Sequence, residues 1–385
     1  MIPYGRQAIS QEDIDTVVSV LRSDFLTQGP AVPRFEQAVA EYCGVRHAVA
    51  MNSATSALHV ACLALGLAPG DWLWTSPITF VASANCALYC SAKVDFVDID
   101  PQTLNISPVA LEAKLIAAQQ AGCLPKIVVA VHMAGHPCDM EAIRSLGIQY
   151  RFAVIEDAAH AIGAWRDGKP VGSCQHSDIT VFSFHPVKII TSAEGGMAVT
   201  NNPDLAERMD LLRSHGITRD PIKMTEASHG PWYYQQVALG FNYRITDLQA
   251  ALGASQMSRL DAFVSRRHEL FCAYNEAFTG LPLTLPVEET GCVSSHHLYI
   301  VKLRQGATHN LRLNVFNQLR ELGIGVNLHY IPVHLQPEYR RLGFGPGDFP
   351  VSEAYYAQAI TLPLFAAMTE CQQQHVISCL QGVLA

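Results

Sequence analysis

The sequence predicts an α/β fold: a large domain with a mostly parallel sheet covered by helices, and a smaller α+β domain at the C-terminus. Short apolar runs typical of strands alternate with segments of helical spacing, and this alternation specifies such a sheet. Hydrophobic residues make up 49% of the 385 residues and charged residues 16%, below the usual value of about 25%, so we expect extensive buried surface, including a subunit interface. A chain of this length is expected to form two domains, which we place at 1–250 and 251–385.

Two amphipathic helices are expected before the first strand. Ser10 begins the first, because the polar run 10–13 is followed by apolar residues at helical spacing up to Leu21. The second has its apolar positions between Phe35 and Tyr42 and ends before Gly44. The turn-rich segment 24–30 joins them.

The strands of the large sheet are expected at short apolar runs. These runs are 48–51, 93–97, 126–131, 152–155 and 178–184. A helix is expected from Ser56, and the glycines at 195 and 196 mark a tight turn into a further strand. The uncharged stretch 72–92 is long enough to cross a bilayer, but its Thr, Ser, Asn and Pro residues indicate a buried loop and helix instead.

A long helix is expected where the large domain leads into the smaller one. The apolar spacing stays helical from 247 to 278 without a proline, which predicts a bridge between the two domains. The later elements are strands at 298–301 and 325–328, a helix at 311–322, and a last helix that Thr369 opens, with Gln372 in the capping position.

Lys188 and Asp157 carry the most specific chemistry. Each lies just past the carboxyl end of an expected strand, where open α/β sheets bind ligands. A lysine amine can form a Schiff base with pyridoxal 5'-phosphate (PLP), and a carboxylate can keep the pyridine nitrogen protonated, so that the ring withdraws electrons. A surface lysine is the ordinary alternative, but the neighbours of Lys188 are nearly all apolar or small. Asp157 alone would fit a helix cap equally well. The pair predicts a PLP site with both residues catalytic.

The run 52–57 is expected to hold the cofactor phosphate. It joins a strand to a helix, so the backbone amides from Ala54 onward and the hydroxyls of Thr55 and Ser56 face an anion at a helix N-terminus. Ordinary N-capping explains the same residues. Ser183 is placed as a further phosphate ligand, and Phe80 as a ring stacked on the cofactor, although an isolated aromatic residue is usually part of a core.

Charge and cysteine content exclude other classes of protein. Lysine and arginine number 26 against 34 acids, giving a net charge of −8 without a basic block, so no nucleic acid or membrane partner is expected. The eleven cysteines include no CxxC pair, and their odd number fits a reducing cytoplasm rather than disulfides or a metal site. The first residues lack the apolar core of a signal peptide, which also favours the cytoplasm.

Many ordered segments resemble the nucleotide-sugar aminotransferases of the DegT/DnrJ/EryC1/StrS family. They are 26–30, 52–58, 79–82, 96–100, 156–160, 183–196, 213–216 and 240–244. The resemblance implies the type I fold of PLP-dependent transferases, which is that of aspartate aminotransferase. The regulator and dehydratase branches fit less well, because the first needs an added DNA-binding domain and the second lacks the lysine found here as Lys188.

Within that family, the runs 52–58, 183–188 and 193–196 are similar to the branch that acts in pseudaminic acid biosynthesis. The resemblance implies transfer of an amino group from L-glutamate to C4 of a UDP-linked 4-keto-6-deoxy-N-acetylhexosamine. The alternative is a sister aminotransferase for another nucleotide-linked keto-sugar, with a different base, stereochemistry or C3 amination, because pocket loops rather than the fold select the substrate.

The resemblance also implies roles for single residues. Lys188 would bind the cofactor and move a proton, Asp157 would pair with the pyridine nitrogen, and His160 would lie near the cofactor. Asn242 would reach the phosphate of a neighbouring subunit, which makes a homodimer with shared active sites. The residues matching sugar or nucleotide contacts are Tyr4, Asp24, Phe25, Leu26, Thr27, Asn327, Leu328, His329 and Tyr330. The ordinary alternatives are packing for Tyr4 and a strand end for His329 and Tyr330.

Overall fold

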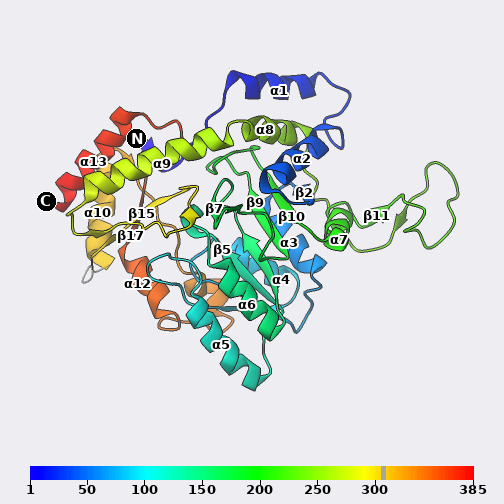
Figure 1. Ribbon diagram of the computed structural model, residues 1–385, viewed down its shortest axis with the longest axis horizontal. Helices are drawn as coiled ribbons and strands as arrows, with labels where there is room; N and C mark the ends of the chain where they lie inside the picture. Colours follow the sequence, from blue (N-terminus) through cyan, green and yellow to red (C-terminus); the bar gives the residue numbers. More distant parts are fainter. Residues whose placement is uncertain (305–308) are drawn as a thin grey trace.

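The structure is a computed structural model that describes residues 1–304 and 309–385. A large sheet with helices on both faces forms one part of the molecule, and a smaller unit, which includes both termini, lies at the other end of its long axis (Figure 1). Within the described residues, none of the helices is both long and apolar enough to span a membrane. The structure confirms the α/β architecture with a large, mostly parallel sheet that the sequence predicts.

The large sheet has seven strands and is mostly parallel, as predicted. Only β10 runs antiparallel to its two neighbours. In spatial order the strands are β2 (His47–Met51), β10 (Gly196–Thr200), β9 (Ile179–Ser183), β6 (Ala153–Asp157), β5 (Ile127–Val131), β3 (Trp72–Thr75) and β4 (Lys93–Phe96).

Helices cover both faces of this sheet, which explains why its central strands are continuous apolar runs rather than alternating ones. In β5, Ile127 and Val129 pack in the cluster that holds α3 and α4, whereas Val128 and Ala130 pack with α5 and α6 on the other face. The helices around the sheet are α1 (Gln11–Leu21), α2 (Ala31–Cys43), α3 (Ala54–Ala64), α4 (Ala82–Tyr89), α5 (Pro108–Ala121), α6 (Met140–Tyr150), α7 (Pro203–Arg213) and α8 (Asp247–Met257).

The smaller unit is built on a second sheet. Its three antiparallel strands are β13 (Leu283–Thr284), β15 (Tyr299–Leu303) and β17 (Ala359–Leu362). They share a hydrophobic cluster with α9 (Leu260–Phe278), α10 (His309–Glu321) and α13 (Glu370–Leu384). The N-terminus joins this unit, because β1 (Ile2–Pro3) pairs in parallel with β16 (Ile324–Gly325). The division of the chain at residue 250 stays a prediction.

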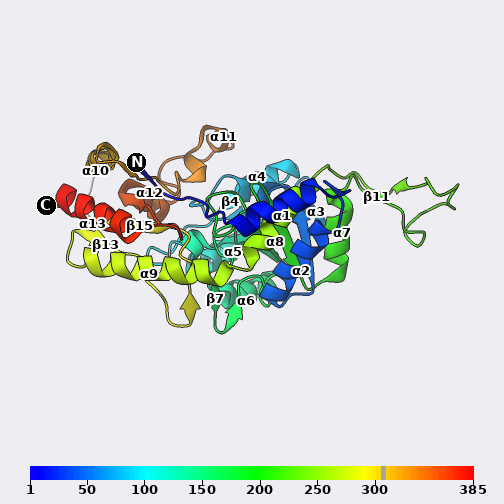
Figure 2. The ribbon, with the colours of Figure 1, turned by 90° about the horizontal axis from the view of Figure 1, so that it is seen from above.

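Short elements complete the chain. They are β7 (Trp165–Arg166), β8 (Lys169–Pro170), β14 (Cys292–Val293), α11 (Pro337–Arg340), α12 (Pro350–Gln358) and the 3₁₀ turns Met133–Gly135 and Val333–Leu335. The strands β11 (Ile217–Thr218) and β12 (Gln235–Gln236) belong to an arm that projects from the body next to α7 (Figures 1 and 2).

The predicted caps of two helices are confirmed. Ser10 accepts a hydrogen bond from the Asp13 amide while the Asp13 side chain accepts from the Ser10 amide, and Thr369 and Gln372 form the same reciprocal pair at the start of α13. The helix α2 ends at Gly44, which has a left-handed backbone with φ of 64°.

Several sequence expectations need correction. The stretch 72–92 is not only a loop and helix, because it begins with β3, which lies between β4 and β5 in the sheet. The helix expected at 247–278 is two helices, interrupted at Ser258 and Arg259, where the Arg259 side chain contacts Asp13 of α1. The helix expected from Ser56 begins at Ala54, and the strand expected at 325–328 ends at Gly325.

Candidate active site

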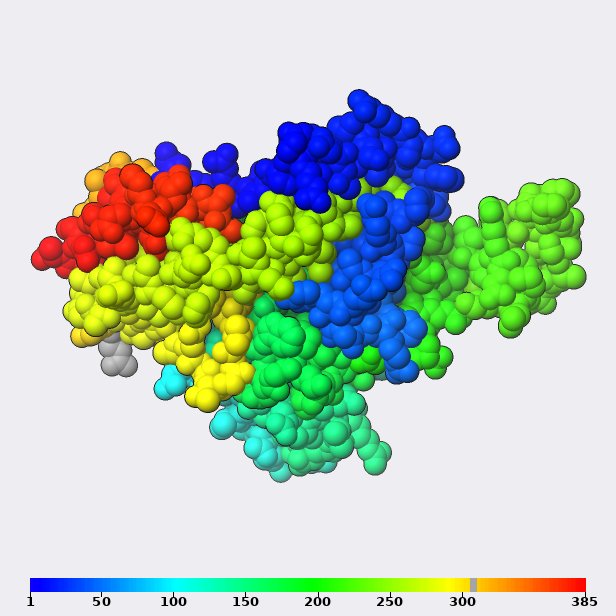
Figure 3. All heavy atoms as spheres, turned by 45° about the horizontal axis from the view of Figure 1, so that its top comes forward, coloured from blue at the N-terminus to red at the C-terminus, as the bar shows by residue number. Residues whose placement is uncertain are grey.

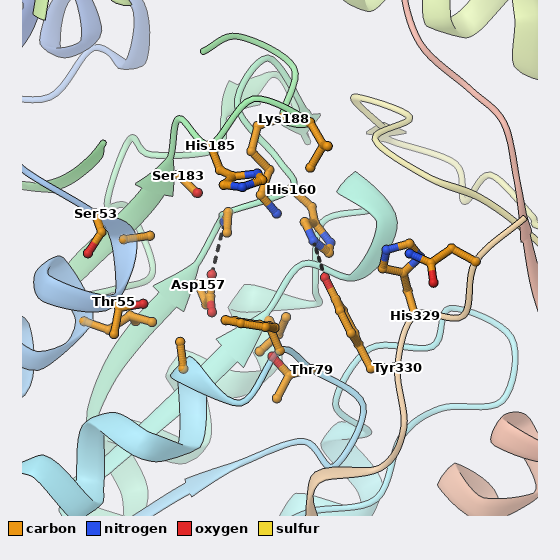
Figure 4. Close-up of a pocket in the computed structure, with 18 of the residues that line it drawn as sticks. Ser53, Thr55, Thr79, Asp157, His160, Ser183, His185, Lys188, His329 and Tyr330 are labelled. Atoms are coloured by element: carbon orange, nitrogen blue, oxygen red, sulfur yellow. Dashed lines mark hydrogen bonds between the residues drawn. The ribbon is translucent and has the colours of Figure 1, made fainter. Parts of the chain in front are cut away.

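A cavity of about 560 Å³ contains most of the predicted site residues (Figure 4). Its wall on the large sheet includes Asp157 at the end of β6, Ser183 at the end of β9, and the first turn of α3. The opposite wall comes from Tyr4 and the segment 327–330, which lie beside the paired β1 and β16 of the smaller unit. The cavity therefore lies at the carboxyl ends of parallel strands, as expected for an open α/β sheet.

Asp157 is held by donors on both carboxylate oxygens. The Ser83 hydroxyl donates to Asp157 Oδ2 at 2.5 Å, and the Ala159 amide donates to Oδ1 at 3.1 Å. Ser83 is itself fully buried, and its oxygen lies 2.7 Å from the Thr79 hydroxyl. These contacts fix the direction of the carboxylate at the floor of the cavity.

Lys188 follows β9 in a loop that lines the cavity, and its amide donates to the His185 carbonyl at 2.9 Å. Burial lowers the pKa of the Lys188 amine to about 8, against the opposing effect of the Asp157 charge. The amine thus loses its proton more readily than an exposed lysine, as a Schiff-base lysine or a proton carrier must.

Neutral histidines surround this amine. Burial and the nearby Lys188 charge hold the pKa of His160 well below its usual range, and the same two causes lower the pKa of His329 to about 3. The Nε2 atom of His160 lies 3.0 Å from the Tyr330 hydroxyl, and the His297 ring packs on the His160 ring with centroids 4.4 Å apart. His160 Nδ1 is buried and has no hydrogen-bond partner among the described residues.

The first turn of α3, the predicted phosphate site, opens into the cavity. Ser53 is the N-cap, and Ala54 and Thr55 line the cavity beside Ser183. The facing strand begins at Gly196, where an added Cβ would lie only 2.3 Å from the Ala54 nitrogen. Glycine at 196 therefore permits the close approach of β10 to the amides of the helix start.

These groups fit PLP. The cavity presents an amine with a lowered pKa, a fixed carboxylate, and a helix N-terminus with hydroxyl groups for a phosphate. Phe80 also lines the cavity and is 59% exposed, so it is not the ordinary core aromatic considered above. The roles of the single residues remain predictions.

Twelve of the predicted residues line the cavity. They are Tyr4, Ala54, Thr55, Phe80, Asp157, His160, Ser183, Lys188, Asn327, Leu328, His329 and Tyr330. The segment 327–330 is not the end of a strand, because β16 ends at Gly325 and Asn327 makes only an isolated bridge to Thr361.

The remaining predicted residues lie outside this cavity. The amide and hydroxyl of Ser56 donate to Ser53 at 3.1 Å and to Asn52 at 2.6 Å, which corresponds to the capping alternative. Asn242 is exposed on the protein surface next to Asn52. The loop residues Asp24, Phe25, Leu26 and Thr27 are also exposed, and Thr27 bridges to Thr246. Their roles in phosphate and substrate binding stay predictions.

Sequence reasoning missed several residues of the site. Ser83 could not be connected with Asp157 because 74 positions separate them and only the parallel sheet brings them together. His185 and Glu194 line the cavity and lie within the run around Lys188, so proximity to that lysine was the available signal. His297 has no signal in the sequence, because its contact with His160 arises where the two units meet.

Comparison with known proteins identifies the family. The chain matches the model of the DegT/DnrJ/EryC1/StrS aminotransferase family over residues 7–381. It is 36% identical to the spore coat polysaccharide biosynthesis protein SpsC of Bacillus subtilis, and the match covers 100% of this chain and 97% of SpsC.

Solved structures show the same likeness. Spr1654 of Streptococcus pneumoniae, a proposed sugar aminotransferase, matches in its PMP form with a TM-score of 0.92 and 29% identity over 100% of this chain and 99% of that one. Its PLP form also matches. Helicobacter pylori PseC, an aminotransferase involved in the biosynthesis of pseudaminic acid, matches with a TM-score of 0.90 and 31% identity over 100% and 99%. The chain therefore belongs to the DegT/DnrJ/EryC1/StrS aminotransferase family and is a PLP-dependent sugar aminotransferase.

Proposed function

We propose that the protein transfers the amino group of L-glutamate to C4 of a UDP-linked 4-keto-6-deoxy-N-acetylhexosamine, a step of pseudaminic acid biosynthesis. The observation that carries the aminotransferase chemistry is the single cavity that unites Lys188, Asp157 and the start of α3. The particular sugar is supported by the runs 52–58 and 183–188 and by the full-length likeness to PseC.

PLP, Asp157 and Lys188 each have a separate role in the proposed reaction. PLP supplies an electron-withdrawing ring that accepts negative charge from the carbon next to the transferred nitrogen. Asp157, whose carboxylate is directed by Ser83 and Ala159, would hold a proton on the pyridine nitrogen when PLP is bound. Lys188, with its lowered pKa, takes the proton from Cα of glutamate and delivers a proton to C4 of the sugar.

The wall formed by Tyr4 and the segment 327–330 holds the sugar. Tyr4 packs on the His329 ring with centroids 5.1 Å apart, and both side chains line the cavity, so this part of the wall is connected. Phe80 extends it, with its ring 6.3 Å from that of Tyr330. A wall of aromatic rings with hydroxyl and amide groups suits a hexose with an N-acetyl group.

The active site is shared between two subunits in this proposal. Asn242 does not line the cavity of its own chain and is exposed, as a residue that serves a neighbour must be. The nearby arm also exposes large apolar side chains, with Ile222 at 93%, Trp232 at 72% and Leu239 at 81%. Large exposed apolar residues on a projecting arm are typical of a surface that a second copy covers.

The alternative is a sister aminotransferase that acts on another nucleotide-linked keto-sugar. The 36% identity to SpsC, a polysaccharide biosynthesis protein, favours it as much as the likeness to PseC favours the first proposal. For either substrate we propose the cytoplasm as the location, because the eleven cysteines include no CxxC pair and are free thiols in the structure.

A substrate panel separates the two functions. The PLP-loaded enzyme is incubated with glutamate and UDP- or dTDP-linked keto-sugars that carry the ketone at C3 or C4, and 2-oxoglutarate release and the position of the new amine are measured. We expect the highest kcat/KM with the UDP-linked 4-keto N-acetyl sugar, and no turnover by Lys188→Ala. A preference for another base or for a C3 ketone would establish the sister function.

A further inference from the structure

A cluster of three potential metal ligands lies outside the active site. His268 lies on α9, and Glu288 and His296 lie in the segment between β13 and β15. His296 is buried at 2% exposure, whereas Glu288 and His268 are exposed. The established cofactor chemistry uses none of the three.

The three ligand atoms converge on one point. His268 Nδ1 lies 3.1 Å from His296 Nε2, His296 Nε2 lies 3.1 Å from Glu288 Oε1, and His268 Nδ1 lies 3.6 Å from the same oxygen. Ligands placed 2.0 to 2.1 Å from a tetrahedral zinc ion lie about 3.3 Å from one another. The triangle therefore has the size of one face of a zinc coordination tetrahedron.

The surroundings allow a metal in this place. The Cys272 sulfur lies 3.5 Å from His268 Nε2, so a proton on Nε2 can point to sulfur and leave the Nδ1 lone pair directed into the triangle. A small cavity of about 40 Å³ borders Glu288 and His296, which gives a fourth, water ligand room. The nearby Arg267 donates its NH1 protons to the carbonyl oxygens of His296, His297 and Leu364 rather than to the triangle.

A second cluster in the same region provides a contrast. His136, Glu289 and Cys292 also bring three ligand atoms together. There, however, Arg166 donates to Glu289 at 3.2 Å and to Cys292 at 3.1 Å, so a guanidinium already occupies the place of a cation. The cluster around His268 has no such guanidinium contact among the described residues.

We propose that His268, Glu288 and His296 bind a divalent transition-metal ion of the zinc class. Two imidazoles and one carboxylate are borderline ligands that suit zinc better than magnesium or calcium. The sequence did not indicate this site, because Glu288 and His296 are separated from His268 along the chain and come close to it only in the folded structure.

The bound ion connects α9 to the segment between β13 and β15, which leads to the active site. His297, the next residue after His296, packs its ring on His160 in the wall of the catalytic cavity. A metal that fixes His296 thus stabilises the junction between the small unit and the large sheet, and by linkage it raises the stability of the folded protein.

The test uses the PLP-loaded full chain, treated with a chelator and then dialysed. Zinc is added and the metal is counted by mass spectrometry, Co²⁺ is added to a second sample to record its visible absorption, and thermal unfolding is measured with and without zinc. We expect one tightly held zinc per chain, cobalt bands of a four-coordinate site, and a higher unfolding midpoint with zinc. His268→Ala and Glu288→Gln should each weaken zinc binding by more than roughly a hundredfold.

Two controls keep the test decisive. His375→Ala removes a helical histidine that also has a cysteine one turn later, Cys379, but lies outside the triangle, so it should keep the zinc. Because His268 and Glu288 are not deeply buried, their variants should fold with PLP absorbance like that of the parent. The proposal is overturned if the parent retains no zinc, or if zinc and the cobalt bands survive in both variants; the triangle is then a metal-free hydrogen-bonded cluster.

Discussion

At the residue scale, the charge state of the Lys188 amine predicts how the stability of the protein depends on pH. The pKa of its amine is about 8 in the folded protein against an ordinary 10.5, so the unfolded chain binds more protons between these two values. The free energy of unfolding of cofactor-free protein should therefore rise from pH 8 to about 10.5, by about 2 to 3 kcal/mol for this group because cavity water partly screens the amine.

The Lys188→Met variant isolates this contribution. It removes the charge while keeping much of the side-chain volume, so it should be more stable than the parent at pH 7, and the difference should disappear toward pH 10.5. Denaturant unfolding at several pH values measures it, with the exposed Lys169→Met as the matched control. A constant difference between parent and Lys188→Met at all pH values would show that the amine has an ordinary pKa.

Substitutions of Asp157 and Ser83 separate the effect of the carboxylate charge from the effect of its orientation. If Asp157 pairs with the pyridine nitrogen as proposed, Asp157→Asn removes the charge that keeps this nitrogen protonated, so we expect turnover slower by several orders of magnitude. Ser83→Ala keeps the carboxylate but deletes the 2.5 Å hydrogen bond to it. Loss of a bond to a charged group is worth about 1.5 to 3 kcal/mol, so kcat should fall roughly ten- to a hundredfold.

The measurement is steady-state kcat at full PLP occupancy, which is checked by absorbance. If Asp157→Asn with bound cofactor turns over nearly as fast as the parent, Asp157 does not act on the ring. Equal losses in the two variants would instead mean that Ser83 does more than direct the carboxylate.

At the scale of elements, the contact between β10 and α3 allows the predicted phosphate site at the start of α3 to be tested. Gly196→Ala places a Cβ 2.3 Å from the Ala54 nitrogen and 2.4 Å from the Ser53 carbonyl carbon, so the first turn of α3 must shift. Overpacking of this kind costs about 1 to 3 kcal/mol. We expect the PLP dissociation constant to rise roughly five- to a hundredfold, as measured by cofactor titration.

Gly382→Ala is the matched control for that prediction. An added Cβ at Gly382, within α13, meets no described atom within 4 Å, so it should leave cofactor binding unchanged and stabilise the helix by about 0.5 to 1 kcal/mol. Unchanged PLP affinity in Gly196→Ala would mean that the start of α3 does not hold the phosphate.

The elements also show how far the sequence predicts the structure. Strands such as 126–131 and 178–184 were predictable because a strand covered on both faces is a continuous apolar run. The strand β3 is also an apolar run, but it was missed because it has only four residues and begins the uncharged stretch 72–92, which continues into α4. The break between α8 and α9 at Ser258 and Arg259 was missed because the apolar spacing continues across it and no proline or glycine marks it.

The residues of the candidate site also include some that the sequence predicted and some that it did not. Lys188 and Asp157 were predictable because each follows a strand and their chemistry is specific. Ser83 was not predictable because its contact with Asp157 depends on the order of the strands in the sheet. His297 was not predictable because its contact with His160 depends on how the segment before β15 packs on the large unit. The structure of a single chain also does not test the predicted functions of Asn242 and of residues 24–27.

At the scale of the whole molecule, the arm around β11 and β12 is the feature that a single chain does not explain. It stands out from the body in every view (Figures 1, 2 and 3). Its tip and base expose large apolar side chains, including Trp232 and Leu239. The low charged fraction of 16% agrees with a surface that is covered by another subunit.

Asn242, at the base of this arm, provides the test of a shared site. If its side chain completes the phosphate site of a neighbour, Asn242→Ala should raise the PLP dissociation constant. Losing one hydrogen bond to a charged phosphate costs about 1.5 to 3 kcal/mol, or roughly ten- to a hundredfold in affinity. PLP should also strengthen the dimer by linkage, which sedimentation at low protein concentration measures with and without cofactor.

Mixed dimers decide whether this effect crosses the interface. Subunits with Lys188→Ala are combined with subunits that carry Asn242→Ala, at a PLP concentration too low to saturate the second variant. In a shared arrangement, one site of the mixed dimer has both lesions and the other has neither, because the intact Lys188 is completed by the partner's intact asparagine. Activity should then return toward half that of the parent dimer. If Asn242 acted within its own chain, each site would have one lesion, and mixing would restore nothing even though tagged subunits co-purify as heterodimers.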